Sequence, residues 1–351
     1  MPNTRPGTGF HDGVCDACRN FKKIRSIDWD VRKRFLKRVC DGIRRDDGGY
    51  DCIVPVSGGK NSHVQVKIVK EDYSLNPLLV TVCDPFSKTD AGRFNAENIG
   101  DVFGCDHVYF SIPRDVFVRA TRLAFEEWCE PLVFIETLIY TYPFILAGQL
   151  GIPMVFFGEG EFELGSDREC FYGDDFVRRK FDRIDPVFWK GKGFSDSELF
   201  YVTPPKGEGL VVVPRVGYLG YCHPWDSDLH YRIASRWGFR DVWHEWKREG
   251  YLECYEQIDS VGYLVHLWLK YPKFGFQRVS DIVGKRIRYG HLSYREGKRI
   301  VDENDWRIDR RSLDDFCGLL GYSIPGFWDV VEGFWNRDIF KRDRFGVWRF
   351  K

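Results

Sequence analysis

The stretch that decides the fold is Cys52-Ile53-Val54-Pro55-Val56-Ser57-Gly58-Gly59-Lys60-Asn61-Ser62-His63. Its apolar start predicts a buried strand, and the glycines that follow mark a tight turn. Two glycines at a strand-to-helix turn let backbone amides approach an anion without a Cβ in the way. Ser57 and Ser62 add hydroxyl donors, Lys60 adds a point charge, and the positive end of a following helix favours an anion. The stretch therefore predicts a cradle for phosphate or pyrophosphate.

An ordinary tight turn is the alternative, because Ser-Gly-Gly occurs in many loops. The position of the glycines, between an apolar strand and a helix, favours the cradle. The Walker pattern G-x-x-x-x-G-K-[ST] is absent from this loop, so the sequence does not favour a kinase-like or GTPase-like loop.

Strands and helices alternate on from this turn. Apolar runs predict further strands at 77–82, 107–110 and 152–157. Residues 63–68 alternate polar and apolar, which alone favours a strand, but the crossover that parallel strands need favours a helix. The alternation predicts an α/β fold with a mostly parallel sheet. Ligands of such sheets bind at the carboxyl ends of the strands, where Gly158 and Glu159 follow the fourth strand.

Three parts are predicted along the chain. Residues 1–45 form a polar N-terminal segment with one C-x-x-C and a charged helix at 29–45, and a break at 46–49 ends it. Residues 46–200 carry the nucleotide-binding domain. Residues 201–351 form a mainly helical substrate-binding module, with short helices expected at 232–240, 261–269, 295–303 and 312–320.

Composition argues against several classes of protein, namely those that bind nucleic acid, span a membrane or are secreted. The 351 residues include 52 Lys and Arg against 52 Asp and Glu, so no global field draws the chain onto nucleic acid or an anionic membrane. The most apolar stretch, 131–157, is interrupted by polar residues, Gly and Pro, and predicts a helix and then a strand. Eleven scattered cysteines without a secretory leader favour a reducing cytosol. We expect a cytoplasmic protein with no membrane segment and no nucleic-acid partner.

The loop resembles the S-G-G-x-D-S signature of the PP-loop ATP pyrophosphatases, with Asn61 in the place of the aspartate. More narrowly, the chain is similar to the N-acetyl sugar amidotransferases of bacterial surface-polysaccharide, or lipopolysaccharide, biosynthesis. The stretches that support this likeness are MPNTRPG at 1–7, GVCDACR at 13–19, NPLLVT at 76–81, WDS at 225–227, YEQIDS at 255–260 and KFGF at 273–276. They are spread over nearly the whole chain.

The resemblance implies a ligase reaction in two steps. ATP adenylates the acetamido oxygen of an N-acetylated nucleotide sugar and releases pyrophosphate. Ammonia from a separate glutaminase subunit then displaces AMP and leaves an acetamidine. Adenylation is needed because an amide carbonyl is a poor electrophile and its oxygen a poor leaving group, and Mg²⁺ would neutralise the phosphates.

The resemblance also implies which residues act. The catalytic candidates are Ser57, Lys60, Asn61 and Ser62. The candidates for binding ATP are Ser57, Gly58, Gly59, Lys60, Asn61, Ser62, Thr81, Gly158 and Glu159.

A basic run in the last third of the chain is the second candidate site. Nine Lys and Arg and only two acidic residues lie between Lys270 and Arg299. A solvated charged face is the usual explanation, and the functional one is a wall for a polyanion, either a nucleotide sugar or RNA, because arginine forks bind diphosphates. The resemblance favours the nucleotide sugar, with these candidate contacts: Lys273, Arg278, Arg286 and Arg288. Asp226, Asp259 and Asp281 are candidates for sugar hydroxyls or a metal, with helix capping and ion pairing as the alternatives.

Cys15 and Cys18 have the spacing of zinc ligands, but a closed zinc site needs four. His11 is a candidate for the third ligand, and Cys40 or a more distant cysteine for the fourth. The similar amidotransferases carry a second C-x-x-C just before the M-P-x-T-R-P stretch, with which this sequence begins, so we expect a zinc half-site. A redox pair is disfavoured because Cys15 and Cys18 do not open a helix in a βαβ unit. Cys222, beside His223, is the one other cysteine kept as a candidate.

Two other functions stay open. An RNA sulfurtransferase also begins with adenylation, but needs a low-pKa cysteine near the nucleotide or an iron–sulfur site. A catalytically reduced nucleotide-binding scaffold subunit is the other alternative, and Asn61 and the single C-x-x-C motivate it.

Overall fold

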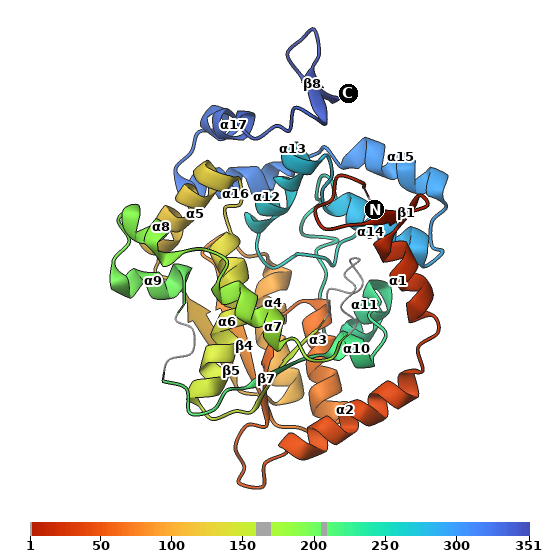
Figure 1. Ribbon diagram of the computed structural model, residues 1–351, viewed down its shortest axis with the longest axis vertical. Coiled ribbons are helices and arrows are strands. Elements are labelled where there is room, and N and C mark those ends of the chain that lie inside the picture. The colour runs from red at the N-terminus through yellow and green to blue at the C-terminus, as the bar shows by residue number, and fades with distance from the viewer. Residues whose placement is uncertain (1, 159–169, 205–208) are drawn as a thin grey trace.

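A five-stranded parallel sheet forms the centre of the protein in a computed structural model that describes residues 2–158, 170–204 and 209–351 (Figure 1). The strands follow the order β5-β4-β3-β6-β7. They are β3 (Cys52–Pro55), β4 (Pro77–Cys83), β5 (His107–Ser111), β6 (Met154–Phe157) and β7 (Arg215–Tyr218). The α/β fold class and the four predicted strands are confirmed. β7 was not predicted, because Arg-Val-Gly-Tyr is too short and mixed to stand out as an apolar run.

Helices cover both faces of this sheet. They are α2 (Trp29–Ile43), α3 (Lys60–Lys67), α4 (Asp90–Phe103), α6 (Val133–Gln149) and α7 (Asp174–Phe181). Ile53 of β3 packs with α6 and α7, whereas its neighbour Val54 packs with α2, α3 and α4. Successive residues of a strand point to opposite faces. Strands covered on both faces are therefore apolar throughout, which is what the sequence shows.

α3 is helical although its sequence alternates polar and apolar residues. Its side chains are buried on every side, and His63 and Gln65 are as hidden as Val64 and Val66. A helix enclosed all round needs no apolar stripe, so its sequence carries no helical period. The chain continues from α3 into a π-helical turn, Ile68–Asp72.

The last third of the chain is mainly helical, as predicted. Its helices are α11 (Ser227–Arg236), α12 (Tyr263–Trp268), α13 (Lys270–Phe274), α14 (Arg278–Arg288), α15 (Tyr294–Asn304), α16 (Arg310–Leu320) and α17 (Ile324–Glu332). In Figure 1, α12 to α17 lie above the sheet, in green-blue to blue, whereas α11 lies beside α3. A backbone hydrogen bond from Val261 N–H to Ser87 O (2.9 Å) ties this part to the end of β4.

Shorter elements complete the fold. They are the hairpin β1 (Phe10–His11) and β2 (Val14–Cys15), α1 (Asp16–Ile24), α5 (Arg114–Trp128), α8 (Pro186–Gly191), α9 (Asp196–Val202), α10 (Leu219–Cys222) and the hairpin β8 (Phe340–Arg342) and β9 (Trp348–Phe350). One buried cluster joins helices from both sides of residue 200. Phe125 of α5, for example, stacks on Phe327 of α17 with ring centroids 5.2 Å apart.

None of the helices in the described ranges has the length and apolar character needed to cross a bilayer. α6, an apolar helix of 17 residues, carries Glu136 and Pro143 and is buried against the sheet.

Candidate functional site

The Ser-Gly-Gly loop lies at the carboxyl end of β3 and leads directly into α3. Gly58 has a φ of +78°, and a Cβ at this position would lie 2.8 Å from the backbone nitrogen of Ala96. Both features require glycine. Ser62 Oγ accepts a hydrogen bond from the Ser57 backbone N–H at 3.0 Å, which closes the loop on itself. Gly59 is the N-cap of α3, so the first N–H groups of this helix have no partner within it.

A pocket opens beside this loop, and we call it the loop pocket. The carboxyl ends of β3, β4 and β6, helix α6 and the segments around residues 225 and 257–263 surround it. Its polar and aromatic lining includes Ser57, Asn61, Ser62, Asp84, Tyr140, Trp225, Gln257, Asp259 and Tyr263. Gly158 also lines it, and a Cβ there would lie 2.6 Å from the Trp225 ring. The predicted residues Ser57, Asn61, Ser62 and Gly158 are therefore brought together at one pocket.

Two carboxylates line the loop pocket. Asp84, just after β4, pairs with Lys88 Nζ at 2.8 Å and accepts a hydrogen bond from the Ser260 hydroxyl at 2.8 Å. Burial raises the pKa of Asp259, although nearby Lys88 opposes the rise. Mg²⁺ is commonly held by one or two carboxylates together with substrate phosphates, so Asp84 and Asp259 fit a magnesium–nucleotide complex. Sequence reasoning singled out Asp259 but missed Asp84, whose signal is its place immediately after a parallel strand.

Lys60 does not line the loop pocket. Its ammonium lies 2.7 Å from Glu256 Oε1, and the two side chains are only 3% and 9% exposed. Glu256 also pairs with Arg278 Nη2 at 2.8 Å and accepts from the Ser227 hydroxyl at 2.7 Å. Although burial opposes its ionisation, these cations hold the pKa of Glu256 well below its ordinary value. The structure thus turns Lys60 toward the helical module rather than toward a phosphate in the loop pocket.

Asn61, the next residue of the loop, also points toward α11. Its Oδ1 lies 2.9 Å from His230 Nδ1, and because an amide oxygen only accepts, the histidine donates. Burial, with help from Lys60 and Lys285, lowers the pKa of His230 to about 3. The imidazole is therefore neutral, and Asn61 is held by an uncharged hydrogen bond.

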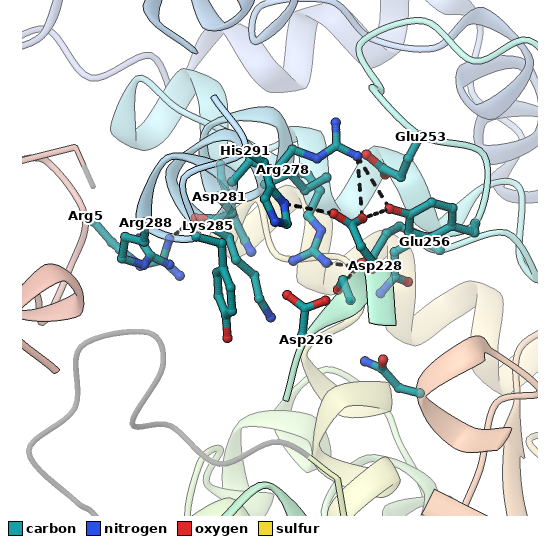
Figure 2. Close-up of a pocket in the computed structure, with 18 residues that line it drawn as sticks. Arg5, Asp226, Asp228, Glu253, Glu256, Arg278, Asp281, Lys285, Arg288 and His291 are labelled. Carbon is teal, nitrogen blue, oxygen red and sulfur yellow. Dashed lines mark hydrogen bonds and ion pairs between the residues drawn. The ribbon is translucent and has the colours of Figure 1, made fainter. Parts of the chain in front are cut away.

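A second pocket adjoins the first, and we call it the basic pocket (Figure 2). Helix α14 supplies much of its wall. Its cationic residues are Arg5, Lys270, Arg278, Lys285, Arg286 and Arg288, and its acidic ones are Asp226, Asp228, Glu253, Glu256 and Asp281. Five of the predicted substrate-site residues lie here, namely Asp226, Arg278, Asp281, Arg286 and Arg288. Asp259 lines the loop pocket instead.

Lys273 is the predicted contact that the structure does not bring to either pocket. Its ammonium lies 3.1 Å from Glu130 Oε1. Asp226 lines the basic pocket. It also caps α11, because its Oδ1 accepts a hydrogen bond from the Leu229 N–H at 2.7 Å, so the helix-capping alternative is confirmed for this residue.

Sequence reasoning missed three cations of the basic pocket. Lys270 and Lys285 belong to the basic run, but a run does not tell which members face inward. Arg5 comes from the far end of the chain, where its guanidinium pairs with Asp281 and lies 5.4 Å from the Phe276 ring centroid. Its only signal is its place in the MPNTRPG stretch.

The two pockets share part of their walls. Asn61 and Gln257 line both of them. Trp225 lines the loop pocket, while its neighbours Asp226 and Ser227 line the basic pocket. A ligand in one pocket therefore lies next to a ligand in the other, with the amides of Asn61 and Gln257 at the junction.

Of the other predicted ATP contacts in the described ranges, Gly58, Gly59 and Thr81 do not line the loop pocket. Thr81 donates to Val56 O at 2.6 Å and lies 2.8 Å from His107 Nε2. Val80 and Val82 line the pocket, so the alternation of the strand turns Thr81 to the opposite face. Glu159 lies outside the described residues.

Cys15 and Cys18 lie together at the start of α1, with Cys15 as its N-cap. Burial opposes ionisation of Cys15, yet hydrogen bonds from Cys18 hold the pKa of Cys15 below its ordinary value. In the described part of the chain, no three His, Cys, Asp or Glu side chains are placed to hold a metal together. The described residues therefore do not fit a closed zinc site. The pair does open α1, but this helix follows the antiparallel hairpin of β1 and β2 and does not belong to a βαβ unit.

The other metal and thiol candidates are engaged elsewhere. His11 lies 3.4 Å from Asp16, and Cys40 is a buried residue of α2. Burial raises the pKa of Cys222 to about 12, so its thiol is protonated near neutral pH.

Comparison with known proteins identifies a family that is similar to the C-terminal part of the chain. Residues 242–351 match the family described as LPS biosynthesis protein WbpG-like, C-terminal domain. The matched segment contains α14 and residues 255–260, and so supplies most of the basic pocket.

A curated relative and two solved structures are similar to this chain. An uncharacterized protein of Methanocaldococcus jannaschii is 30% identical over 86 residues, which cover 24% of this chain and 30% of that protein. NMN synthetase from Francisella tularensis shows 11% identity and a TM-score of 0.36, with 84% of this chain and 94% of that chain covered. NH3-dependent NAD synthetase from Campylobacter jejuni shows 10% identity and a TM-score of 0.36, covering 82% and 96%.

Proposed function

We propose that this protein is an ATP-dependent amidotransferase that adenylates the acetamido oxygen of an N-acetylated nucleotide sugar and then replaces AMP with ammonia. The observation that supports it is the shared wall of Asn61 and Gln257 between the loop pocket and the basic pocket. Adenylation of a nucleotide sugar needs two polyanions, ATP and the sugar nucleotide, side by side with their reacting ends in contact. Adjacent pockets, one at a phosphate-type loop and one rich in Arg and Lys, meet that need.

In this proposal ATP lies in the loop pocket. Backbone N–H groups at the start of α3 and the hydroxyl of Ser57 would bind its phosphates. The Trp225 ring supplies an apolar wall, and Asp84 and Asp259 would hold Mg²⁺, which neutralises phosphate charge when bound.

The nucleotide sugar lies in the basic pocket, with its diphosphate toward the cations of α14 and its acetamido group at the junction. The amide oxygen attacks the α-phosphorus of ATP, and pyrophosphate leaves. Ammonia then adds to the activated carbon and AMP departs, so the acetamide becomes an acetamidine. Asn61 and Gln257 would orient the acetamido group through their amides.

The match of residues 242–351 to a family named for LPS biosynthesis supports a substrate from surface-polysaccharide synthesis. Ammonia would come from a separate glutaminase subunit, as the resemblance implies.

The test is pyrophosphate release from ATP and Mg²⁺, with ammonium chloride as the nitrogen source, across a panel of N-acetylated nucleotide sugars. Release is expected with one sugar only and is expected to be lost in Ser57→Ala. Ser26→Ala is the matched control, because Ser26 is exposed and its hydroxyl bonds only the Lys23 carbonyl. Mass spectrometry of the product should show the acetamidine.

Other outcomes contradict the proposal. Tight ATP binding with no release for any sugar favours the catalytically reduced scaffold. Copurifying RNA or labile sulfide favours the sulfurtransferase, although no cysteine of the described ranges lines either pocket.

A further inference from the structure

The basic pocket has two chemically different ends. Figure 2 shows Arg5, Lys285 and Arg288 on one side and Glu253 and Glu256 on the other. A phosphate would be attracted to the first end, whereas the carboxylates of the second end can accept hydrogen bonds. A ligand that fills the pocket therefore needs an anionic part and a part that donates hydrogen bonds.

Glu253 is the unusual member of the acidic end. Both of its carboxylate oxygens are buried, and neither accepts a hydrogen bond from any residue that the structure describes. Burial raises the pKa of this carboxyl, and the neighbouring charge of Glu256 raises it further. A buried carboxyl without a hydrogen bond is rare in folded proteins because its desolvation is not compensated.

The other carboxylates of this pocket are already engaged. Asp228 accepts from the Tyr255 hydroxyl and pairs with His291 Nδ1 at 3.2 Å. Asp281 pairs with Arg5, and Glu256 with Lys60. Asp226 caps α11. Glu253 is thus the carboxylate of the pocket whose two acceptor oxygens are left for a ligand.

The opposite end holds a matching unsatisfied donor. Arg288 Nη1 is buried and donates to no acceptor within the described ranges. One pocket therefore carries a buried acceptor pair at one end and a buried cationic donor at the other. Their separation argues that they serve two parts of one ligand rather than each other.

The charges around Glu253 narrow the class of donor. The positive charges of Arg248, Arg278 and Arg286 all oppose the rise in the pKa of its carboxyl. An ammonium group would be repelled by these guanidinium groups, whereas neutral hydroxyls would not. Two neighbouring hydroxyls match two carboxylate oxygens.

We propose that Glu253 binds a vicinal diol of a glycosyl or ribosyl diphosphate whose diphosphate lies at the Arg5, Lys285 and Arg288 end of the basic pocket. This inference rests on the proposed function for the identity of the ligand as a nucleotide sugar. It adds two points to that function. Glu253 is the residue that accepts hydrogen bonds from the hydroxyls, and the ligand lies with its diphosphate at the opposite end of the pocket.

The test measures binding by calorimetry without ATP or ammonia, so it does not depend on adenylation. The probes are inorganic pyrophosphate and UDP-N-acetylglucosamine. Glu253→Ala is expected to weaken binding of the nucleotide sugar about 10- to 100-fold, as for a hydrogen bond to a charged group, and to leave pyrophosphate binding unchanged. Arg288→Met is expected to weaken both. Glu249→Ala is the matched control, an exposed glutamate four positions away.

Two deoxy probes identify the source of the diol. If the ribose is bound, the 2′-deoxy analogue binds Glu253→Ala and the unaltered protein equally. If the hexose is bound, the 4-deoxyhexose analogue does so. Either result supports the inference.

A stability measurement separates binding from folding. Removing an uncompensated buried carboxyl is expected to leave the thermal midpoint of Glu253→Ala without ligand unchanged or higher. The inference is overturned if the unaltered protein binds UDP-N-acetylglucosamine no more tightly than pyrophosphate. It is also overturned if Glu253→Ala binds both probes normally, or if the variant melts lower and loses both.

Discussion

Substitution of Glu256 by Gln tests how the loop is tied to the helical module. The change keeps the size of the side chain but leaves the Lys60 ammonium without its counter-charge, 3% exposed and 2.7 Å from the substituted group. Breaking a buried ion pair from one side costs about 3–5 kcal/mol. Domains are stable by only about 5–15 kcal/mol, so the expected loss is at least about a fifth of the free energy of unfolding.

The assay is denaturant unfolding followed by fluorescence of the twelve tryptophans. Asp72→Asn is the matched control, since it breaks a Lys–Asp pair at the other end of α3. That pair is 31% and 36% exposed, and its loss should cost less than about 1 kcal/mol. The double variant Lys60→Met, Glu256→Gln is expected to recover much of the stability, because both buried charges are gone.

Two results would refute this reasoning. One is a Glu256→Gln variant as stable as Asp72→Asn. The other is a double variant no more stable than the single one. The pH dependence is a further check. The pKa of Glu256 is held low, so its contribution is present above the ordinary carboxyl pKa and is lost as pH falls below about 4.

Further predictions concern the loop, its histidine and one buried aspartate. Gly58→Ala, at φ +78°, should cost about 1–3 kcal/mol in unfolding and abolish ATP binding by calorimetry. Asn61→Asp should raise the pKa of His230 from about 3 toward its ordinary range, measured by NMR titration, since a carboxylate would then face the ring; an unmoved pKa would contradict the contact. Burial raises the pKa of Asp305 to about 7, so the native state keeps this proton longer and stability should fall from about pH 4 to pH 7; this slope should vanish in Asp305→Asn.

Much of the sheet domain could be predicted from the sequence, because strands that are buried on both faces appear as continuous apolar runs. The run Cys52–Val56 needs no partner to identify it as a strand, and the glycines after it fix the turn. β7 shows the limit, since Val216 is a fully buried strand residue flanked by Arg, Gly and Tyr. This segment is a strand because it pairs with β6, and the sequence of the segment alone does not reveal that pairing.

The candidate site was readable only where the chain is locally continuous. The loop residues Ser57, Asn61 and Ser62 were found because they adjoin one turn. Lys60 shows what a motif leaves out, because its direction depends on Glu256, which is 196 positions away along the chain. Ion pairs between residues far apart in the sequence determine where a charged side chain points, and a local sequence motif does not predict such pairs.

The pair formed by Arg5 and Asp281 has a consequence for how the protein is made. These residues are 276 positions apart, yet they complete one wall of the basic pocket. At a ribosome speed of about 5–20 residues per second, Arg5 waits roughly 15–55 s after its own synthesis before its partner is made. The N-terminal segment must stay available through that interval. A nascent chain held at residue 200 should therefore expose this segment to a protease that cannot cut it in the finished molecule.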